Sequence, residues 1–131
     1  MNAASKSTIK PRVLVVDDND VVRSAFASLF EALGCQAIQA RSGLEALEIV
    51  ENESVSIVFL DYQMPNMTGP EVAKELRAQH NGDIPIIGMS IDGEPWRAEA
   101  CLAAGMDEFI EKVADIEVYE HILDRWVHGS N

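Results

Sequence analysis

Three acidic side chains in this sequence stand where a carboxylate is energetically costly. Asp17 and Asp18 directly follow the apolar segment "RVLVV" (12–16), and Asp61 directly follows "SIVFL" (56–60). A carboxylate at the edge of a buried strand needs a hydrogen bond or an opposite charge to compensate for its burial. If the two segments lie side by side, the three carboxylates repel one another, and a cation would relieve that repulsion. Oxygen ligands with open positions suit Mg²⁺, which keeps several waters and accepts phosphate oxygens.

Two further polar side chains follow later apolar segments. Ser90 ends "PIIGMS" (85–90), and Lys112 follows "DEFIE" (107–111). A hydroxyl and an ammonium at the same edge as three carboxylates and a metal would form a site for the transfer of a phosphoryl group to a carboxylate.

These side chains can meet only if the elements that carry them form one sheet. Five apolar segments are predicted to be strands, at 12–16, 35–40, 56–60, 85–90 and 107–111. Five amphipathic segments between and after them are predicted to be helices, at 20–34, 43–52, 71–80, 95–105 and 115–128. This strict alternation predicts an α/β fold with a parallel five-stranded sheet and helices on both faces. In the strand order 2-1-3-4-5, the order reverses between the first and third strands, and ligands bind outside the carboxyl ends of the strands at that point.

Local signals predict where several helices begin and which face one of them buries. Ser42 and Thr68 are predicted N-caps, and Pro70 suits the first turn of a helix. The helix at 20–34 is predicted to bury one face, formed by Val22, Ala25, Phe26, Leu29 and Leu33.

The composition indicates one globular domain. The chain has 131 residues, of which 47% are hydrophobic, and we expect a domain at 12–128 with short tails at 1–11 and 129–131. No apolar stretch approaches the ~20 residues of a membrane-spanning helix, and the N-terminus does not look like a secretory signal. A net charge of −12 argues against binding to nucleic acid. Cys35 and Cys101 are predicted to be buried thiols of a cytoplasmic protein.

With these motifs the chain resembles the receiver domain of two-component response regulators over about residues 12–128. The resemblance rests on "LVVDD" (14–18), "FLDYQMPNMTG" (59–69), "GMS" (88–90) and "AAGMDEFIEK" (103–112), in that order. It implies that Asp61 accepts a phosphoryl group from a histidine kinase or a histidine phosphotransfer protein. It also implies that Mg²⁺, or Mn²⁺ in its place, is bound by Asp18, Asp61 and the backbone carbonyl of Gln63, with Asp17 acting through a water.

The resemblance further assigns roles around the phosphoryl group. Ser90 would donate a hydrogen bond to a phosphoryl oxygen, and Lys112 would pair with it. Phe109 matches the switch aromatic, whose movement would change the surface formed by the fourth helix, fifth strand and fifth helix. Such a domain is a signalling phosphoacceptor with only self-phosphorylation and self-dephosphorylation chemistry, and it is not an enzyme.

Two positions depart from the usual pattern of the family. Val113 follows Lys112 where proline is usual, often after a cis bond, and we expect a trans bond or a reshaped loop because a non-proline cis bond costs about 3 kcal/mol. Ile91 follows Ser90 where alanine or glycine is common. Ile91 is predicted to narrow access to the site, beside Gln63.

Each candidate residue also has an ordinary structural explanation. Asp61 could cap the loop that follows it, Asp17 could cap a helix, and Ser90 could satisfy a turn. Lys112 could be a solvated surface residue, and Phe109 a core residue.

Three other functions compete with that of a phosphorylated receiver. A haloacid-dehalogenase-like hydrolase needs an acid two positions after its nucleophile, where this chain has Gln63. A flavin or nucleotide module needs a glycine-rich loop after the first strand, which the sequence lacks. A receiver-like domain that only binds a partner, independently of phosphorylation, remains the alternative. The output protein or attached domain is not specified, and both a stand-alone regulator and a segment of a hybrid kinase stay open.

Overall fold

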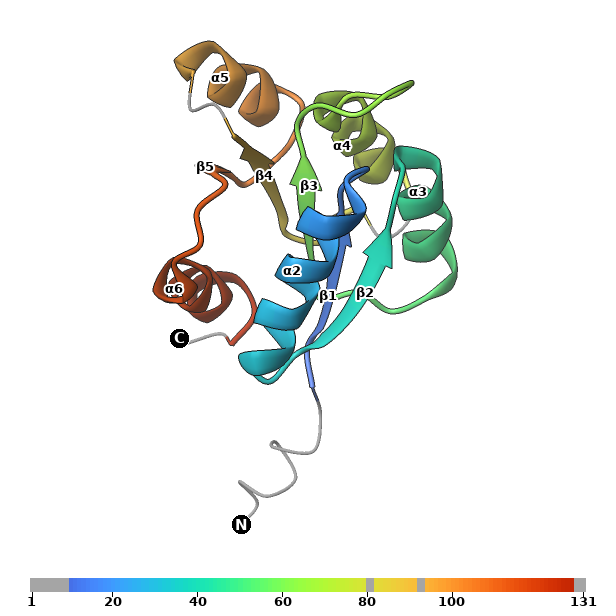
Figure 1. Cartoon of the computed structure of the whole chain (residues 1–131). Helices are drawn as coiled ribbons and strands as arrows, with labels where there is room; N and C mark the ends of the chain where they lie inside the picture. The colour runs from blue at the N-terminus through green and yellow to red at the C-terminus, as the bar shows by residue number, and fades with distance from the viewer. Residues whose placement is uncertain (1–9, 80–81, 92–93, 129–131) are drawn as a thin grey trace.

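Strands and helices alternate along the whole described chain. The computed structural model describes residues 10–79, 82–91 and 94–128 (Figure 1). The strands are β1 (Arg12–Val16), β2 (Gln36–Ala40), β3 (Ile57–Asp61), β4 (Ile86–Ser90) and β5 (Glu108–Glu111). The helices are α2 (Asp20–Ala32), α3 (Gly43–Asn52), α4 (Gly69–Ala78), α5 (Pro95–Ala103) and α6 (Ile116–Trp126). Most of the predicted N-terminal tail and all of the C-terminal one lie outside the described residues.

The five strands form one parallel sheet in the order β2-β1-β3-β4-β5, which confirms the predicted α/β fold (Figure 1). The register pairs Val13 with Ile57 and Val16 with Leu60. Because Val16 and Leu60 lie opposite each other, the residues that directly follow them, Asp17 and Asp61, are neighbours at this edge of the sheet. This register brings the predicted site together.

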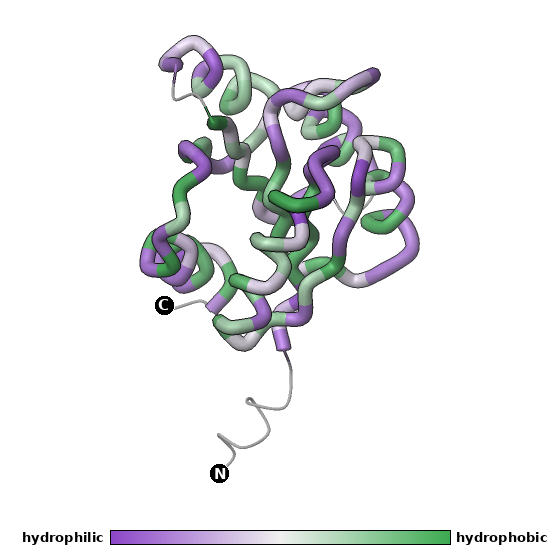
Figure 2. The backbone as a smooth tube through the Cα atoms, viewed as in Figure 1, coloured by the Kyte–Doolittle hydropathy of each residue, from purple (hydrophilic) through white to green (hydrophobic). Residues whose placement is uncertain are grey.

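The sheet separates two cores because successive side chains of a strand point to opposite faces. On one face, Val13 and Val15 pack with side chains of α2 and α6. On the other, Leu14 and Val16 pack with α3, α4 and α5 (Figure 1). All residues of β3 and β4 are buried, and hydrophobic residues accordingly concentrate in the middle of the molecule (Figure 2).

The buried face of α2 agrees with the predicted one in most positions: Phe26 is buried, and Val22, Leu29 and Leu33 pack against the core. Ala25 is exposed, and the fully buried Phe30 lies on the stripe that faces the sheet. The stripe is formed by Arg23, Phe26, Ala27 and Phe30. The predicted face left out Arg23, because hydrophobic periodicity does not count a charged residue.

The predicted helix starts at Ser42 and Thr68 are confirmed. Ser42 accepts a hydrogen bond from the amide of Glu45, and Thr68 forms a capping box with Glu71. Asn19, and not Asp17, is the N-cap of α2, and its side chain accepts a hydrogen bond from the amide of Val22. None of the helices within the described residues is long and apolar enough to cross a membrane.

Candidate functional site

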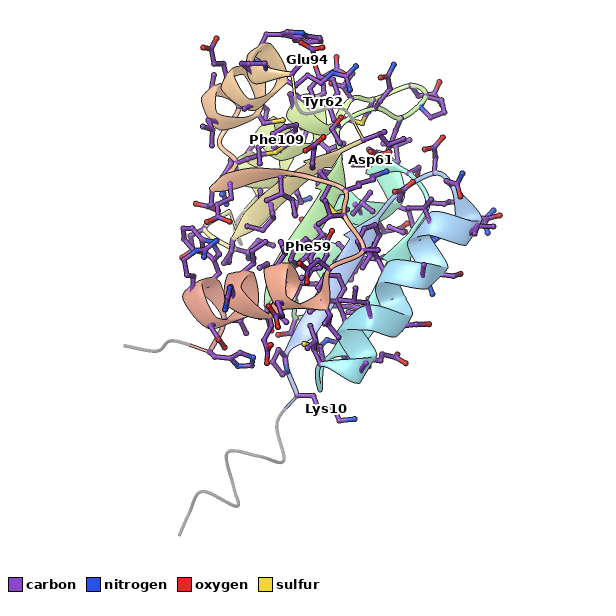
Figure 3. All side chains as sticks on the ribbon, turned by 60° about the vertical axis from the view of Figure 1, so that its left-hand side comes forward. Lys10, Phe59, Asp61, Tyr62, Glu94 and Phe109 are labelled. Atoms are coloured by element: carbon purple, nitrogen blue, oxygen red, sulfur yellow. The ribbon has the colours of Figure 1, made fainter. Side chains whose placement is uncertain are left out.

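The three carboxylates meet at the carboxyl ends of β1 and β3. Each of Asp17, Asp18 and Asp61 offers an oxygen, and these oxygens all lie within 4.8 Å of one another. Asp17 and Asp61 are buried, with 1% and 6% of their surface exposed, whereas Asp18 is exposed. Figure 3 shows Asp61 at the end of its strand, with Tyr62 beyond it on the side of α5. The structure thus brings together the acids that the sequence places at two strand ends.

Lys112 compensates two of these carboxylates directly. Its Nζ lies 2.8 Å from Asp17 Oδ2 and 3.1 Å from Asp61 Oδ1. The backbone positions it, because the amide of Lys112 donates to the carbonyl of Ser90 at 2.7 Å and so continues the pairing of β4 with β5. Lys112 is therefore not a solvated surface lysine.

Burial and the neighbouring charges shift the pKa values of Asp61 and Lys112. Burial, and then the charge of Asp17, raise the pKa of Asp61 to about 6, although Lys112 counteracts them. Burial lowers the pKa of Lys112, but its hydrogen bond to Asp17 and the charge of Asp61 outweigh this effect, and the pKa is raised. The cluster thus holds more negative charge than its lysine neutralises.

The donor set fits a hard divalent cation. All side-chain ligands are carboxylate oxygens, which Mg²⁺ prefers, and a cation would stabilise the ionised form of Asp61, whose pKa is raised by burial and then by the charge of Asp17. Asp18 is open to solvent, which leaves room for the waters that Mg²⁺ retains.

One cavity of about 400 Å³ collects the predicted site residues. It is lined by Asp17, Asp18, Asn19, Val22, Asp61, Gln63, Ser90, Ile91, Arg97 and Lys112. Phe109 is the one predicted site residue outside this lining. It is half-buried and packs against the core on the α3–α5 face, where a side chain on Gly88 would come within 3.1 Å of its ring.

The loop after Asp61 is fixed against the sheet by its backbone. The amide of Tyr62 donates to the carbonyl of Met89, and the amide of Gly69 donates to the carbonyl of Tyr62, both at 2.8 Å. A Cβ at position 69 would lie 2.6 Å from the carbonyl oxygen of Asp61, so only glycine fits there without a shift. The loop supports the main chain of Asp61.

Sequence reasoning missed Arg23, which holds the backbone of Asp17. Arg23 is 8% exposed, and its guanidinium donates to the carbonyl of Asp17 at 2.9 Å and to Asp20 Oδ1 at 2.7 Å. The sequence feature that could have revealed Arg23 is its helical spacing, which places a charged residue on the buried face of α2.

Tyr119 was missed as well, and it accounts for the loop that begins at Val113. Among the described residues there is no cis peptide bond, so Val113 follows Lys112 through a trans bond, as expected. The hydroxyl of Tyr119 donates to the carbonyl of Val113 at 2.8 Å and accepts from its amide at 3.2 Å. A proline at 113 would have no amide hydrogen for the second bond.

Arg97, on α5, is the third residue that the sequence did not reveal. Its Nη1 donates a hydrogen bond to Ser90 Oγ at 2.8 Å. The hydroxyl of Ser90 therefore has a partner on α5, and satisfying a local turn does not account for it alone. Nothing in the spacing of Arg97 from Ser90 predicts this contact.

Relatives with similar sequences are signalling proteins. The chain is 37% identical over 124 residues to the CAI-1 autoinducer sensor kinase/phosphatase CqsS of Vibrio cholerae, a match that covers 93% of this chain and 18% of that protein. It is 36% identical over 104 residues to the two-component response regulator ORR11 of Oryza sativa, covering 78% of this chain and 71% of the regulator. The chain thus spans less than a fifth of the length of the sensor kinase.

Solved structures of receiver domains share the fold. The receiver domain of a sensor histidine kinase from Pseudomonas aeruginosa, determined with a magnesium ion in its active-site cleft, is 27% identical with a TM-score of 0.85, and the match covers 92% of this chain and 100% of that one. Chemotaxis protein CheY4 of Vibrio cholerae is 26% identical with a TM-score of 0.85, covering 91% and 100%. Residues 13–124 match the response regulator receiver domain family. The chain therefore belongs to the receiver domain family of two-component signalling systems.

Proposed function

We propose that this receiver domain accepts a phosphoryl group on Asp61. The observation that carries the proposal is the position of Asp61 in one cavity with two other carboxylates, Lys112 and the hydroxyl of Ser90. With a pKa of about 6, the carboxyl of Asp61 is mostly ionised at neutral pH and is available as a nucleophile.

The proposed donor is a phosphohistidine of a histidine kinase or of a histidine phosphotransfer protein. An oxygen of Asp61 attacks the phosphorus, the P–O bond forms as the P–N bond breaks, and the imidazole leaves with the electron pair of that bond. Lys112 pairs with the phosphoryl oxygens, and Ser90 donates a hydrogen bond to one of them. Relatives that include a sensor kinase and a response regulator support this class of donor.

The residues that would hold the metal are Asp17, Asp18, Asp61 and the backbone carbonyl of Gln63. Mg²⁺, or Mn²⁺, would supply positive charge that offsets the charge on the transferring phosphoryl group. The magnesium ion in the Pseudomonas aeruginosa receiver domain supports this assignment.

The proposed output is a change of surface rather than a catalysed reaction. Phosphorylation would move Phe109 and change the surface of α5, β5 and α6, which an output protein or an attached domain would recognise. The proposed signalling unit is the domain at 12–128, a cytoplasmic phosphoacceptor that turns over no substrate and binds neither nucleic acid nor membrane.

Acetyl phosphate tests the proposal directly. Wild-type protein incubated with acetyl phosphate and Mg²⁺ should gain one phosphoryl group in intact-mass analysis, and Asp61→Asn should gain none. Asp124→Asn is a matched control because Asp124 is exposed on α6 and lies outside the site; it should be phosphorylated like wild type. An adduct that persists in Asp61→Asn would overturn the assignment.

The second candidate is a domain that binds a partner without phosphorylation. It is favoured by Ile91, whose side chain is 79% exposed at the lining of the cavity, and by Val113 in place of proline. A folded wild-type protein that takes no phosphoryl group from acetyl phosphate or from a phosphohistidine donor would support this candidate over the first.

A further inference from the structure

Arg97 is a second basic side chain in the lining of the cavity, besides Lys112. It projects from the first turn of α5, and its Nη1 lies 2.8 Å from Ser90 Oγ. The same cavity is lined by Asp61, the proposed acceptor. The guanidinium therefore lies close to where a phosphoryl group on Asp61 would be bound.

Two aromatic rings hold the guanidinium in place. Its Cζ lies 4.8 Å from the centroid of Tyr62 and 5.2 Å from that of Trp96, and the two rings meet edge to face at 6.0 Å. Cation–π contacts of this kind attract a guanidinium to the faces of the rings and restrict its position. Tyr62 directly follows Asp61, so the platform for Arg97 is attached to the acceptor's own strand end (Figure 3).

The guanidinium has binding capacity that the described residues do not use. Its Nε is buried without a hydrogen-bond partner, and no carboxylate among the described residues lies within 4.0 Å of it. Of the five other arginines of the described chain, four pair with a carboxylate and the fifth, Arg41, is exposed to solvent; the four are Arg12, Arg23, Arg77 and Arg125. Arg97 is partly buried, lines the cavity of the proposed acceptor and has no such partner in the described part of the chain, and this combination suits it to bind an anion.

We propose that Arg97 is a phosphoryl-binding residue, whose guanidinium donates hydrogen bonds to the phosphoryl oxygens on Asp61. The inference rests on the proposed function. A phosphoryl group on Asp61 carries up to about two negative charges in place of the single charge of the carboxylate, and Lys112 already pairs with two carboxylates. The planar fork of arginine donors matches phosphate oxygens, and Arg97 thereby supplies the positive charge that Lys112 cannot supply alone.

Beryllium fluoride is a suitable probe, because it binds to a carboxylate as a stand-in for a phosphoryl group. Beryllium fluoride is titrated into the protein in saturating Mg²⁺, and fluorine NMR monitors the adduct on Asp61. The affinity of the protein for beryllium fluoride should be roughly tenfold weaker in Arg97→Ala and Arg97→Gln than in wild type. Arg97→Lys keeps the charge but loses the planar fork of donors, so its affinity for beryllium fluoride should lie between that of wild type and that of Arg97→Ala. Arg125→Ala makes the same change in net charge at an exposed ion pair and should match wild type.

Affinity for Mg²⁺ alone separates anion binding from damage to the fold. Removing a cation beside an acidic cluster should leave Mg²⁺ binding unchanged or make it tighter, while the affinity for beryllium fluoride falls. Weakening of both affinities to the same extent in Arg97→Ala and Arg97→Gln would overturn the proposal, because it would place Arg97 in the support of the acidic cluster.

A double-mutant cycle separates direct contact from an effect through Ser90. If Arg97 only positions the hydroxyl, Arg97→Ala has no further effect in a Ser90→Ala background. We expect the loss of beryllium fluoride affinity to persist in that background. Its disappearance there, or equal affinities in wild type and Arg97→Ala, would overturn the inference and leave the proposed function intact. If the wild type binds no beryllium fluoride, the proposed function fails and the inference fails with it.

Discussion

The ammonium of Lys112 lies 2.8 Å from the carboxylate of Asp17, across 95 positions of sequence, and 3.1 Å from that of Asp61. One cation thus joins the two buried acids of the cluster, while Asp18 adds a third, exposed carboxylate. The site consequently has negative charge in excess, and its stability should respond both to divalent cations and to pH.

Mg²⁺ should raise the melting temperature of the protein, because a ligand that binds only the native state shifts the equilibrium toward it. At a free concentration 100 times Kd, the gain in the free energy of unfolding would be about 2.7 kcal/mol. Asp18→Ala should nearly abolish the gain, and Asp17→Ala should weaken it. Thermal melts with and without Mg²⁺ measure the effect, and equal gains in wild type and Asp18→Ala would contradict the metal assignment.

Without metal, the charge of Asp61 should destabilise the fold. Its pKa is about 6 in the folded protein against an ordinary value of 3.8, so its ionisation opposes folding. This penalty is absent below about pH 4 and fully developed above about pH 6. The free energy of unfolding of Asp61→Asn relative to wild type should therefore rise by roughly 2–3 kcal/mol between pH 4 and pH 7.5. Urea unfolding in chelator at both pH values measures it; a difference that does not change with pH would contradict the raised pKa.

Ile91 should lengthen the lifetime of the phosphoryl group. Hydrolysis needs a water in line with the P–O bond opposite the leaving carboxylate, and an isoleucine at the lining of the cavity narrows that approach. Ile91→Ala should shorten the phosphoryl half-life by about tenfold, or ~1.4 kcal/mol of barrier. Phosphate release from the purified phosphoprotein measures this rate.

Val21→Ala is the matched control for Ile91→Ala. Val21 is also 79% exposed, but it lies outside the lining of this cavity, so its truncation should leave the half-life unchanged. An Ile91→Ala half-life equal to or longer than that of wild type would show that Ile91 does not limit the access of water.

The hydroxyl of Tyr119 should stabilise the loop that follows Lys112. Tyr119→Phe removes two hydrogen bonds to the backbone of Val113 and should lower the free energy of unfolding by about 1–2 kcal/mol. Hydrogen exchange at the amide of Val113 should become faster, because that amide loses its partner. Unchanged exchange and unchanged stability would show that the loop is held by other contacts.

The fold and the positions of the acids could be predicted because the signals for them are local. A run of apolar residues predicts a strand, apolar residues at a period of 3.6 predict a helix, and a residue such as Thr68 predicts a helix start. Each of these patterns lies within a short stretch of sequence. Once the alternation predicts parallel strands, the acid after each apolar segment must lie at the same edge of the sheet. That shared edge is why the sequence alone is enough to group Asp17 and Asp18 with Asp61.

Only the tertiary structure decided which side chains touch. Lys112 meets Asp17, Arg97 meets Ser90 and Tyr119 meets Val113 because the packing of their elements sets the directions of the side chains, and no periodicity within one segment encodes those directions. The buried position of Arg23 likewise depends on the carbonyl of Asp17 that it reaches. The sequence determined which groups stand at the strand ends, whereas packing determined how their charges are compensated, since a charge is balanced by neighbours in space and not by neighbours in sequence.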